Sequence, residues 1–181
     1  MSMNKLSVTI EGTSPLLMHR FPMEPIEHIE KRTPEEQAEI AAYRDAATQL
    51  LYVPGIALQR CLVRGAAYSK GKGRSSLQKS AAACLLIAEE KLSLGTQDFV
   101  VDARPVVIAA TKGRIIRYRP RIDAWKVSFS LEFDPALLKE SECRRIVDDS
   151  GTRVGLLDFR PERNGPFGRF VVVNWSKEKG G

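Results

Sequence analysis

The chain has 181 residues, of which 43% are hydrophobic and 28% charged, and its formal net charge at pH 7 is +6. This length fits one domain with its own core, and no apolar run approaches the ~20 residues of a membrane span. The three cysteines and two histidines fit neither a disulfide framework nor a metal site, so we expect no metal and no cofactor. Reduced cysteines and a polar N-terminus without a secretory leader indicate a cytoplasmic protein.

The first half of the chain alternates strand and helix signals. Lys5–Glu11 alternates apolar and polar residues and predicts a half-buried strand. A capping box at Thr33–Glu36 predicts a helix that continues to about Gln49. Pro54-Gly55 opens a second predicted helix over Ile56–Tyr68. The glycine-rich basic stretch 69–76 predicts a mobile loop, and 77–87 fits either a helix or the start of a strand.

The second half contains the most regular strand. Extended segments are predicted at 99–101, 105–109 and 114–118, and Trp125–Phe133 places five large apolar residues on one face. Asp134-Pro135 is expected to begin a helix that runs to about Asp149 and ends at Gly151. Phe170–Trp175 is the last predicted strand, and a disordered tail is expected over about 176–181.

The order of these elements is strand, helix, strand, strand, helix, strand. It predicts an α+β, ferredoxin-like βαββαβ core with an inserted hairpin or loops, as in RNA-recognition domains whose sheet face stacks bases. We expect a single domain over residues 1–181, with an acidic helical insertion at about 22–50.

The charges are segregated along the chain. Residues 23–45 are predominantly acidic, whereas 46–88 and 103–122 carry many cations and no acid. A surface built only for solubility mixes both signs. The two basic stretches therefore favour a nucleic-acid partner, with an unpartnered basic surface as the alternative.

The glycine-rich loop, which we define as Val154 to Phe170, is the most distinctive segment. Its glycines allow a ligand to approach the backbone, its arginines suit phosphates, and Phe159 and Phe167 suit stacking on bases. The alternative is a structural loop whose arginines pair with Asp158 and Glu162. No Walker motif is present.

The segment 114–125 carries a second basic pattern. Arg117, Arg119 and Arg121 share one face of an extended chain, which would line a groove for a nucleic-acid backbone. The alternative is an exposed edge strand protected by its charge.

The histidines give no positive case for an enzyme. His19 follows the first strand and is a candidate general base for RNA cleavage, but a lone histidine beside leucines is more often a packing or surface residue. No catalytic triad can be assembled from the sequence, so we expect no enzymatic activity.

Three features stand out together: the first strand leading into GTSPLLMH, the segment LYVPGIALQRCLVRGAAY, and the glycine-rich loop before the last strand. This combination resembles the repeat-associated mysterious protein (RAMP) superfamily, and within it the backbone subunits of CRISPR effector complexes. The resemblance implies a ferredoxin-like core that binds single-stranded guide RNA and stacks head-to-tail, with an extended hairpin, the thumb, wedged between nucleotides. A phage or mobile-element relative with the same fold fits the pattern as well.

We therefore predict a single-stranded nucleic-acid-binding backbone subunit, with RNA as the expected ligand, single-stranded DNA as the alternative, and no membrane partner. Other copies of the chain and other effector-complex subunits are the expected protein partners, with the acidic segment facing a neighbour's basic surface. Stacking is expected from Tyr118 or Phe167. Phosphate contacts are expected from Arg60, Arg64, Lys70, Lys72, Arg74, Arg114, Arg117, Arg119, Arg121, Arg160, Arg163 and Arg169.

Two other functions remain open from the sequence. One is a metal-independent endoribonuclease of the same superfamily that uses His19. The other is a phage or mobile-element assembly protein whose basic stretches bind acidic protein partners rather than nucleic acid.

Overall fold

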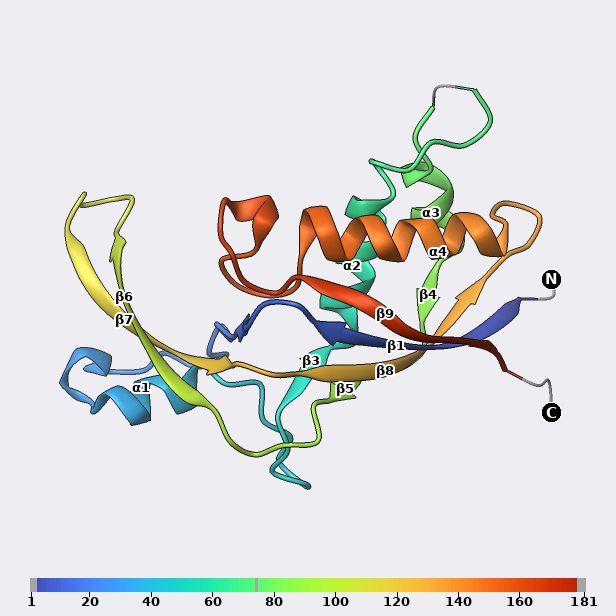
Figure 1. Ribbon diagram of the computed structural model, residues 1–181. Helices are drawn as coiled ribbons and strands as arrows, with labels where there is room; N and C mark the ends of the chain where they lie inside the picture. The colour runs from blue at the N-terminus through green and yellow to red at the C-terminus, as the bar shows by residue number, and fades with distance from the viewer. Residues whose placement is uncertain (1–2, 74, 179–181) are drawn as a thin grey trace.

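The fold is built around a four-stranded antiparallel sheet (Figure 1). The computed structural model describes residues 3–73 and 75–178. The sheet has the order β4-β8-β1-β9, with β1 at Asn4–Gly12, β4 at Leu86–Ile87, β8 at Lys126–Phe133 and β9 at Phe170–Lys177. Two crossover helices, α2 (Gly55–Gly65) and α4 (Glu140–Asp149), complete a βαββαβ unit. The chain passes through α2 between β1 and β4 and through α4 between β8 and β9, and in each case one other strand lies between the two connected strands. The α+β ferredoxin-like core is thus confirmed.

The core lies between one face of the sheet and the helices. Leu6, Val8 and Ile10 of β1 are all at most 1% exposed, and Val8 pairs directly with Phe129 of β8. Alternation of apolar and polar residues buries one face of each strand, and α2 contributes Leu58 and Leu62 from the facing stripe. The helices, with the short α3 (Gln78–Cys84), lie on this side of the sheet (Figure 1).

The opposite face of the sheet is open and polar. Lys5 forms an ion pair with Glu132 at 2.6 Å, and Lys126 pairs with Glu11 at 3.2 Å. Thr9 and Ser128 share a hydrogen bond of 2.8 Å between the same two strands. Charges on this face are mixed and paired, as on a surface that mainly keeps a protein in solution.

An inserted hairpin projects away from the sheet, as expected (Figure 1). Its strands are β6 (Val100–Val107) and β7 (Arg114–Ile122), and the short β2 (Leu16–Leu17) pairs with the base of β7. The helix α1 (Pro34–Ile40) packs beside the hairpin. The remaining elements are β3 (Tyr52–Pro54) paired with β5 (Lys91–Ser93), the 3-10 turns η1 (Ile29–Lys31) and η3 (Pro161–Arg163), and the π-helical turn η2 (Ser150–Val154). In the described ranges no helix is long and apolar enough to cross a membrane.

The predicted helix from Thr33 to Gln49 is wrong beyond Ile40. Its capping box is present, because Thr33 Oγ1 accepts the Glu36 N–H and the Glu36 carboxylate accepts the Thr33 N–H. The helix ends at Ile40, with Ala41 as its C-cap. Beyond it, Arg44 forms an isolated bridge with Leu51, and Asp45 accepts the N–H groups of Ala47 and Thr48 at 3.0 Å each. Such a side-chain turn competes with helix continuation. The insertion at 22–50 is therefore much less helical than expected.

Three further boundaries differ from the sequence prediction. Asp134 caps a turn through the Ala136 N–H at 2.9 Å, and the helix begins only at Glu140. Its other end, at Asp149, is as predicted, but Gly151 does not stop the chain from turning: the π-helical turn η2 follows and includes it. Gly151 is needed there for space, because a Cβ would collide with Phe170. β9 includes Ser176 and Lys177, so the predicted disordered tail begins too early; residues 179–181 lie outside the described range.

Candidate nucleic-acid site

A cleft of about 350 Å³ lies between α2, the glycine-rich loop and the segment after β2. We call it the arginine cleft, because its lining includes Arg60, Arg64, Arg160 and Arg163. Arg60 and Arg64 share one face of α2 because residues four apart lie one above the other on a helix. The loop brings the other two arginines from about 100 positions later in the chain. Four cations from two elements thus face one cavity.

The glycine-rich loop is held in a fixed shape by backbone contacts. Gly155 and Gly168 have φ angles of +76° and +75°, in the left-handed region that favours glycine. The Leu156 N–H donates to the Gly168 carbonyl at 2.9 Å, and the Gly168 N–H donates to the Pro15 carbonyl at 2.8 Å. These contacts attach the loop to the end of β1 and present its arginines to the cleft.

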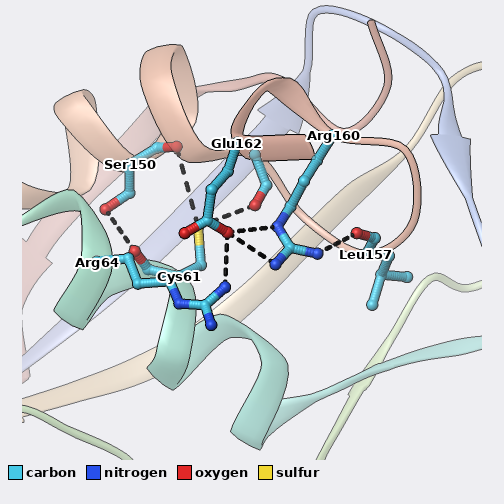
Figure 2. Close-up of polar contacts among 7 residues, drawn as sticks. Cys61, Arg64, Ser150, Leu157, Arg160 and Glu162 are labelled. Atoms are coloured by element: carbon cyan, nitrogen blue, oxygen red, sulfur yellow. Dashed lines mark hydrogen bonds and ion pairs between the residues drawn. The ribbon is translucent and has the colours of Figure 1, made fainter. Parts of the chain in front are cut away.

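Glu162 joins the two halves of the cleft (Figure 2). Its Oε2 accepts from Arg64 Nη1 at 2.6 Å, and from Arg160 Nε and Nη2 at 3.1 and 2.8 Å. Arg160 also donates through Nη1 to the Leu157 carbonyl at 2.7 Å. Burial raises the pKa of Glu162, but the hydrogen bonds and charges of Arg160 and Arg64 outweigh burial and lower it.

The other two arginines of the cleft are free to bind a ligand. Arg60 and Arg163 are exposed, and within residues 3–73 and 75–178 neither side chain has an ion-pair or hydrogen-bond partner. An unpaired guanidinium can donate to a phosphate in bidentate geometry without losing an existing contact. These two residues are therefore the strongest candidates for phosphate contact.

The floor of the cleft is closed by a buried thiol rather than by a reactive one. Cys61 donates from Sγ to the Gly155 carbonyl at 3.2 Å. Ser150 Oγ donates to the Cys61 carbonyl at 3.3 Å (Figure 2) and to the Ile146 carbonyl at 2.7 Å. Burial raises the pKa of the Cys61 thiol to about 12, so it stays protonated at neutral pH. Cys61 is a packing residue that anchors α2 to the loop.

His19 lies at the edge of the cleft within a small charge network. Its Nδ1 is 3.5 Å from Asp158 Oδ2, and its Nε2 is 2.9 Å from Arg117 Nη1. Asp158 Oδ2 also accepts from the buried Arg119 at 2.5 Å. Burial raises the pKa of Asp158, but the hydrogen bond from His19 and the charge of Arg119 outweigh burial and lower it to about 2.

The low pKa of Asp158 predicts a pH-dependent contribution to stability. A carboxyl whose pKa is depressed on folding stabilises the protein above its unfolded pKa of about 3.9, and this contribution is lost as the pH falls towards 2. Partial exposure reduces the effect to about 1–2 kcal/mol. Between pH 4 and pH 2 the wild-type protein should therefore lose that much more unfolding free energy than Asp158→Asn in denaturant titrations. Parallel pH curves for the two proteins would contradict the assignment.

The remaining predicted basic residues lie outside the cleft. Lys70 and Lys72 are exposed in the segment between α2 and α3, Arg114 is exposed near the hairpin turn, and Arg74 lies outside the described residues. Arg121 pairs with Asp123 at 2.6 Å and with Asp102 at 3.6 Å. Arg169 donates to the Thr152 carbonyl. The predicted set is thus not one continuous surface.

Two predicted contact residues are buried in this structure. Arg119 is 6% exposed and neutralised by Asp158, and it does not extend a free basic face with Arg117 and Arg121. Phe167 is 4% exposed, with the Arg104 guanidinium 4.9 Å above its ring, so a base has no access to it. Tyr118 is only half-buried and lines the groove between α1 and β7.

Base stacking on the sheet, as in RNA-recognition domains, is not supported. The aromatic residues of β8 and β9 point to the helix side: Phe129 and Phe133 are buried, and Trp175 donates to Glu140 of α4 at 3.2 Å. Among the described residues of β1, β8 and β9, the open face carries no aromatic side chain. The periodicity of the strands identifies which residues are inward but not which face a ligand uses.

Two residues of the site were missed as site residues by sequence reasoning. Tyr43 lines the cleft beside the arginines, and Glu162 bridges two of them. His19, which also lines the cleft, was considered only as a candidate catalytic base. The pairing of loop arginines with loop acids was considered only as a structural alternative. It is correct for Arg160 with Glu162, whereas Asp158 pairs with Arg119 of β7.

A solved structure, described as the cryo-EM structure of the type III-B Cmr-beta bound to cognate target RNA, shares this fold. The alignment has a TM-score of 0.58 and 12% sequence identity, and it covers 98% of this chain and 61% of that chain. At this identity the likeness concerns the fold alone. No family model matches the chain, and no curated protein matches its sequence.

Proposed function

We propose that the protein is an RNA-binding subunit of a ribonucleoprotein complex and that RNA binds at the arginine cleft. The observation that carries the proposal is the convergence of Arg60, Arg64, Arg160 and Arg163 on one cavity. Two of them, Arg60 and Arg163, have no partner among the described residues. Phosphate contacts of this kind supply most of the affinity in sequence-independent binding. The cleft lies opposite the polar sheet face, whose paired charges offer no comparable surface.

The shared fold supports a more specific form of this proposal. The matched structure is described as bound to cognate target RNA, and the same fold over 98% of this chain makes a CRISPR effector-type subunit the best model. In the proposed assembly several copies of the protein line one RNA strand head-to-tail. The β6–β7 hairpin is the thumb that separates nucleotides. The hairpin carries the apolar residues Val107 and Ile116, which are 60% and 56% exposed. A hairpin that wedges between nucleotides needs accessible apolar side chains of this kind.

The proposal is tested by fluorescence anisotropy with labelled single-stranded RNA, single-stranded DNA and duplex DNA at two salt concentrations. We expect tight, salt-sensitive and cooperative binding to single strands, with RNA preferred. Equal weak binding to all three, together with oligomers that form without nucleic acid and ignore its addition, would instead favour the protein-assembly alternative.

An endoribonuclease that uses His19 is the competing function, and the geometry at this residue argues against it. A guanidinium can only donate, so Nε2 of His19 must accept from Arg117 at 2.9 Å. The lone pair that a general base would use is therefore occupied. We propose that His19 positions Arg117 and Asp158 and that the protein is not an enzyme.

His19→Ala should consequently leave RNA chemistry unchanged. We expect no cleavage of a labelled hairpin RNA by either protein in a gel assay, and an RNA affinity that changes less than about 3-fold. Cleavage by the wild-type protein that is lost in His19→Ala would establish the endoribonuclease and refute this role of His19.

A further inference from the structure

The contact between Glu162 and two arginines has the geometry of an anion site. Arg64 approaches Oε2 from α2, and Arg160 approaches the same oxygen through two nitrogens from the loop (Figure 2). Three charge-assisted donors around one oxygen form the arrangement that binds phosphate oxygens, for which arginine is especially suited. The carboxylate of Glu162 occupies the position that a phosphate oxygen would take.

Glu162 can leave this position without releasing the loop. Its side chain is 29% exposed and it lies on the short turn η3. The loop is held independently by the Leu156–Gly168 and Gly168–Pro15 backbone hydrogen bonds, and by the Asp158 N–H donating to the Leu17 carbonyl at 3.0 Å. Arg160 is also kept in place by the Leu157 carbonyl at 2.7 Å.

We propose that Arg64 and Arg160 form a phosphate subsite and that Glu162 is an internal stand-in, which a phosphate of the bound strand must displace. This inference rests on the proposed function and adds a specific phosphate position to it. Arg60 and Arg163, which pair with no carboxylate within residues 3–73 and 75–178, capture the strand first. A phosphodiester then replaces one negative charge by another between Arg64 and Arg160, so this pair adds little net affinity while Glu162 is present.

Binding at this subsite exchanges one anion, the carboxylate of Glu162, for another, the phosphate of the strand. In the free protein the two guanidinium groups already have an acceptor, and binding must break three hydrogen bonds before it can form new ones. Hydrogen bonds to charged groups are the strongest kind in proteins, and their loss offsets most of the gain from the phosphate. Removing the competing charge at position 162 should therefore increase affinity for phosphate-bearing ligands.

The test compares Glu162→Gln with wild type in RNA binding. We expect the affinity for single-stranded RNA to rise about 3- to 10-fold, because the neutral amide competes weakly for the guanidinium groups. Glu11→Gln is the matched control: it makes the same substitution at an acid paired with Lys126 on the open face of the sheet at 3.2 Å. The RNA affinity of this control should change less than about 2-fold, because the substituted residue lies away from the cleft and its charge is screened by salt.

A further variant tests whether the gain in affinity of Glu162→Gln depends on both arginines. In an Arg64→Ala background, Glu162→Gln should no longer raise the affinity by the same factor, because half of the subsite is absent. An unchanged or lower affinity of Glu162→Gln in the wild-type background would overturn the inference. It would identify Glu162 as a tether whose loss loosens the loop.

Titration with inorganic phosphate separates this inference from the proposed function. We expect phosphate to raise the melting temperature of Glu162→Gln more than that of the wild-type protein, since a vacant subsite binds the anion only in the folded state. If neither protein binds RNA but phosphate stabilises the variant selectively, the subsite exists and serves free phosphate, and the proposed function is wrong. Equal phosphate effects on both proteins would contradict the subsite itself.

Discussion

Replacing both Arg60 and Arg163 by alanine is expected to weaken binding to single-stranded RNA about 10- to 100-fold at physiological salt. Both guanidinium groups face the cleft and are exposed, and in the described chain neither has a partner, so each can neutralise one phosphate. Each lost phosphate contact removes about 0.7 from the slope of log affinity against log salt for a single strand. The salt slope of the double variant should therefore fall by about 1.4, measured by anisotropy at several salt concentrations.

The control for this prediction is a pair of basic residues that do not line the arginine cleft. Lys79 on α3 and Lys139 before α4 are exposed, and Lys79→Ala with Lys139→Ala makes the same net charge change. This control should lower the affinity only slightly, because exposed charges that do not contact the strand are screened by salt. Equal losses in the two double variants would show that net charge, and not the arginine cleft, determines binding.

Gly168→Ala is expected to destabilise the fold by about 3 kcal/mol. The residue has a φ of +75°, and a Cβ there would lie 2.1 Å from the Leu156 carbonyl oxygen, which is backbone and cannot rotate away. The strained conformation and the displaced backbone both cost free energy. Because the displaced loop carries Arg160 and Arg163, RNA affinity should fall as well. Denaturant titration measures the first effect and anisotropy the second.

Gly95→Ala separates the two causes of this loss. Gly95 has a similar φ of +67°, but nothing lies within 4 Å of the position of its Cβ. The variant should therefore show only the conformational cost of about 1 kcal/mol, with unchanged RNA binding. A Gly168→Ala protein as stable as Gly95→Ala would mean that the loop is not held against Leu156.

The βαββαβ core could be predicted because each strand has one buried face. Val127, Phe129 and Leu131 alternate with polar residues in β8, and this periodicity is a local property of the sequence. Helix ends were less predictable, because they depend on side-chain turns such as the one at Asp134. A local pattern does not show whether an aspartate will cap a helix or form a separate turn before it.

The site was predictable in composition but not in arrangement. The acid-free stretch around α2 and the arginines of the glycine-rich loop indicated which segments carry cations. Their meeting in one cleft depends on contacts between residues about 100 positions apart, which no local pattern encodes. The same limit explains why Arg119 and Phe167 were predicted to contact RNA. The sequence does not show that Arg119 pairs with Asp158, or that the Arg104 guanidinium covers the ring of Phe167.

The most direct measurement of the central claim is photo-crosslinking of labelled RNA to a benzophenone side chain at single positions. Ala57 on α2 lines the arginine cleft, whereas Ser128 of β8 is exposed on the open face of the sheet. The account predicts that RNA crosslinks efficiently at position 57 and only at background level at position 128. Efficient crosslinking at position 128 with background at position 57 would contradict it and would place the RNA on the sheet.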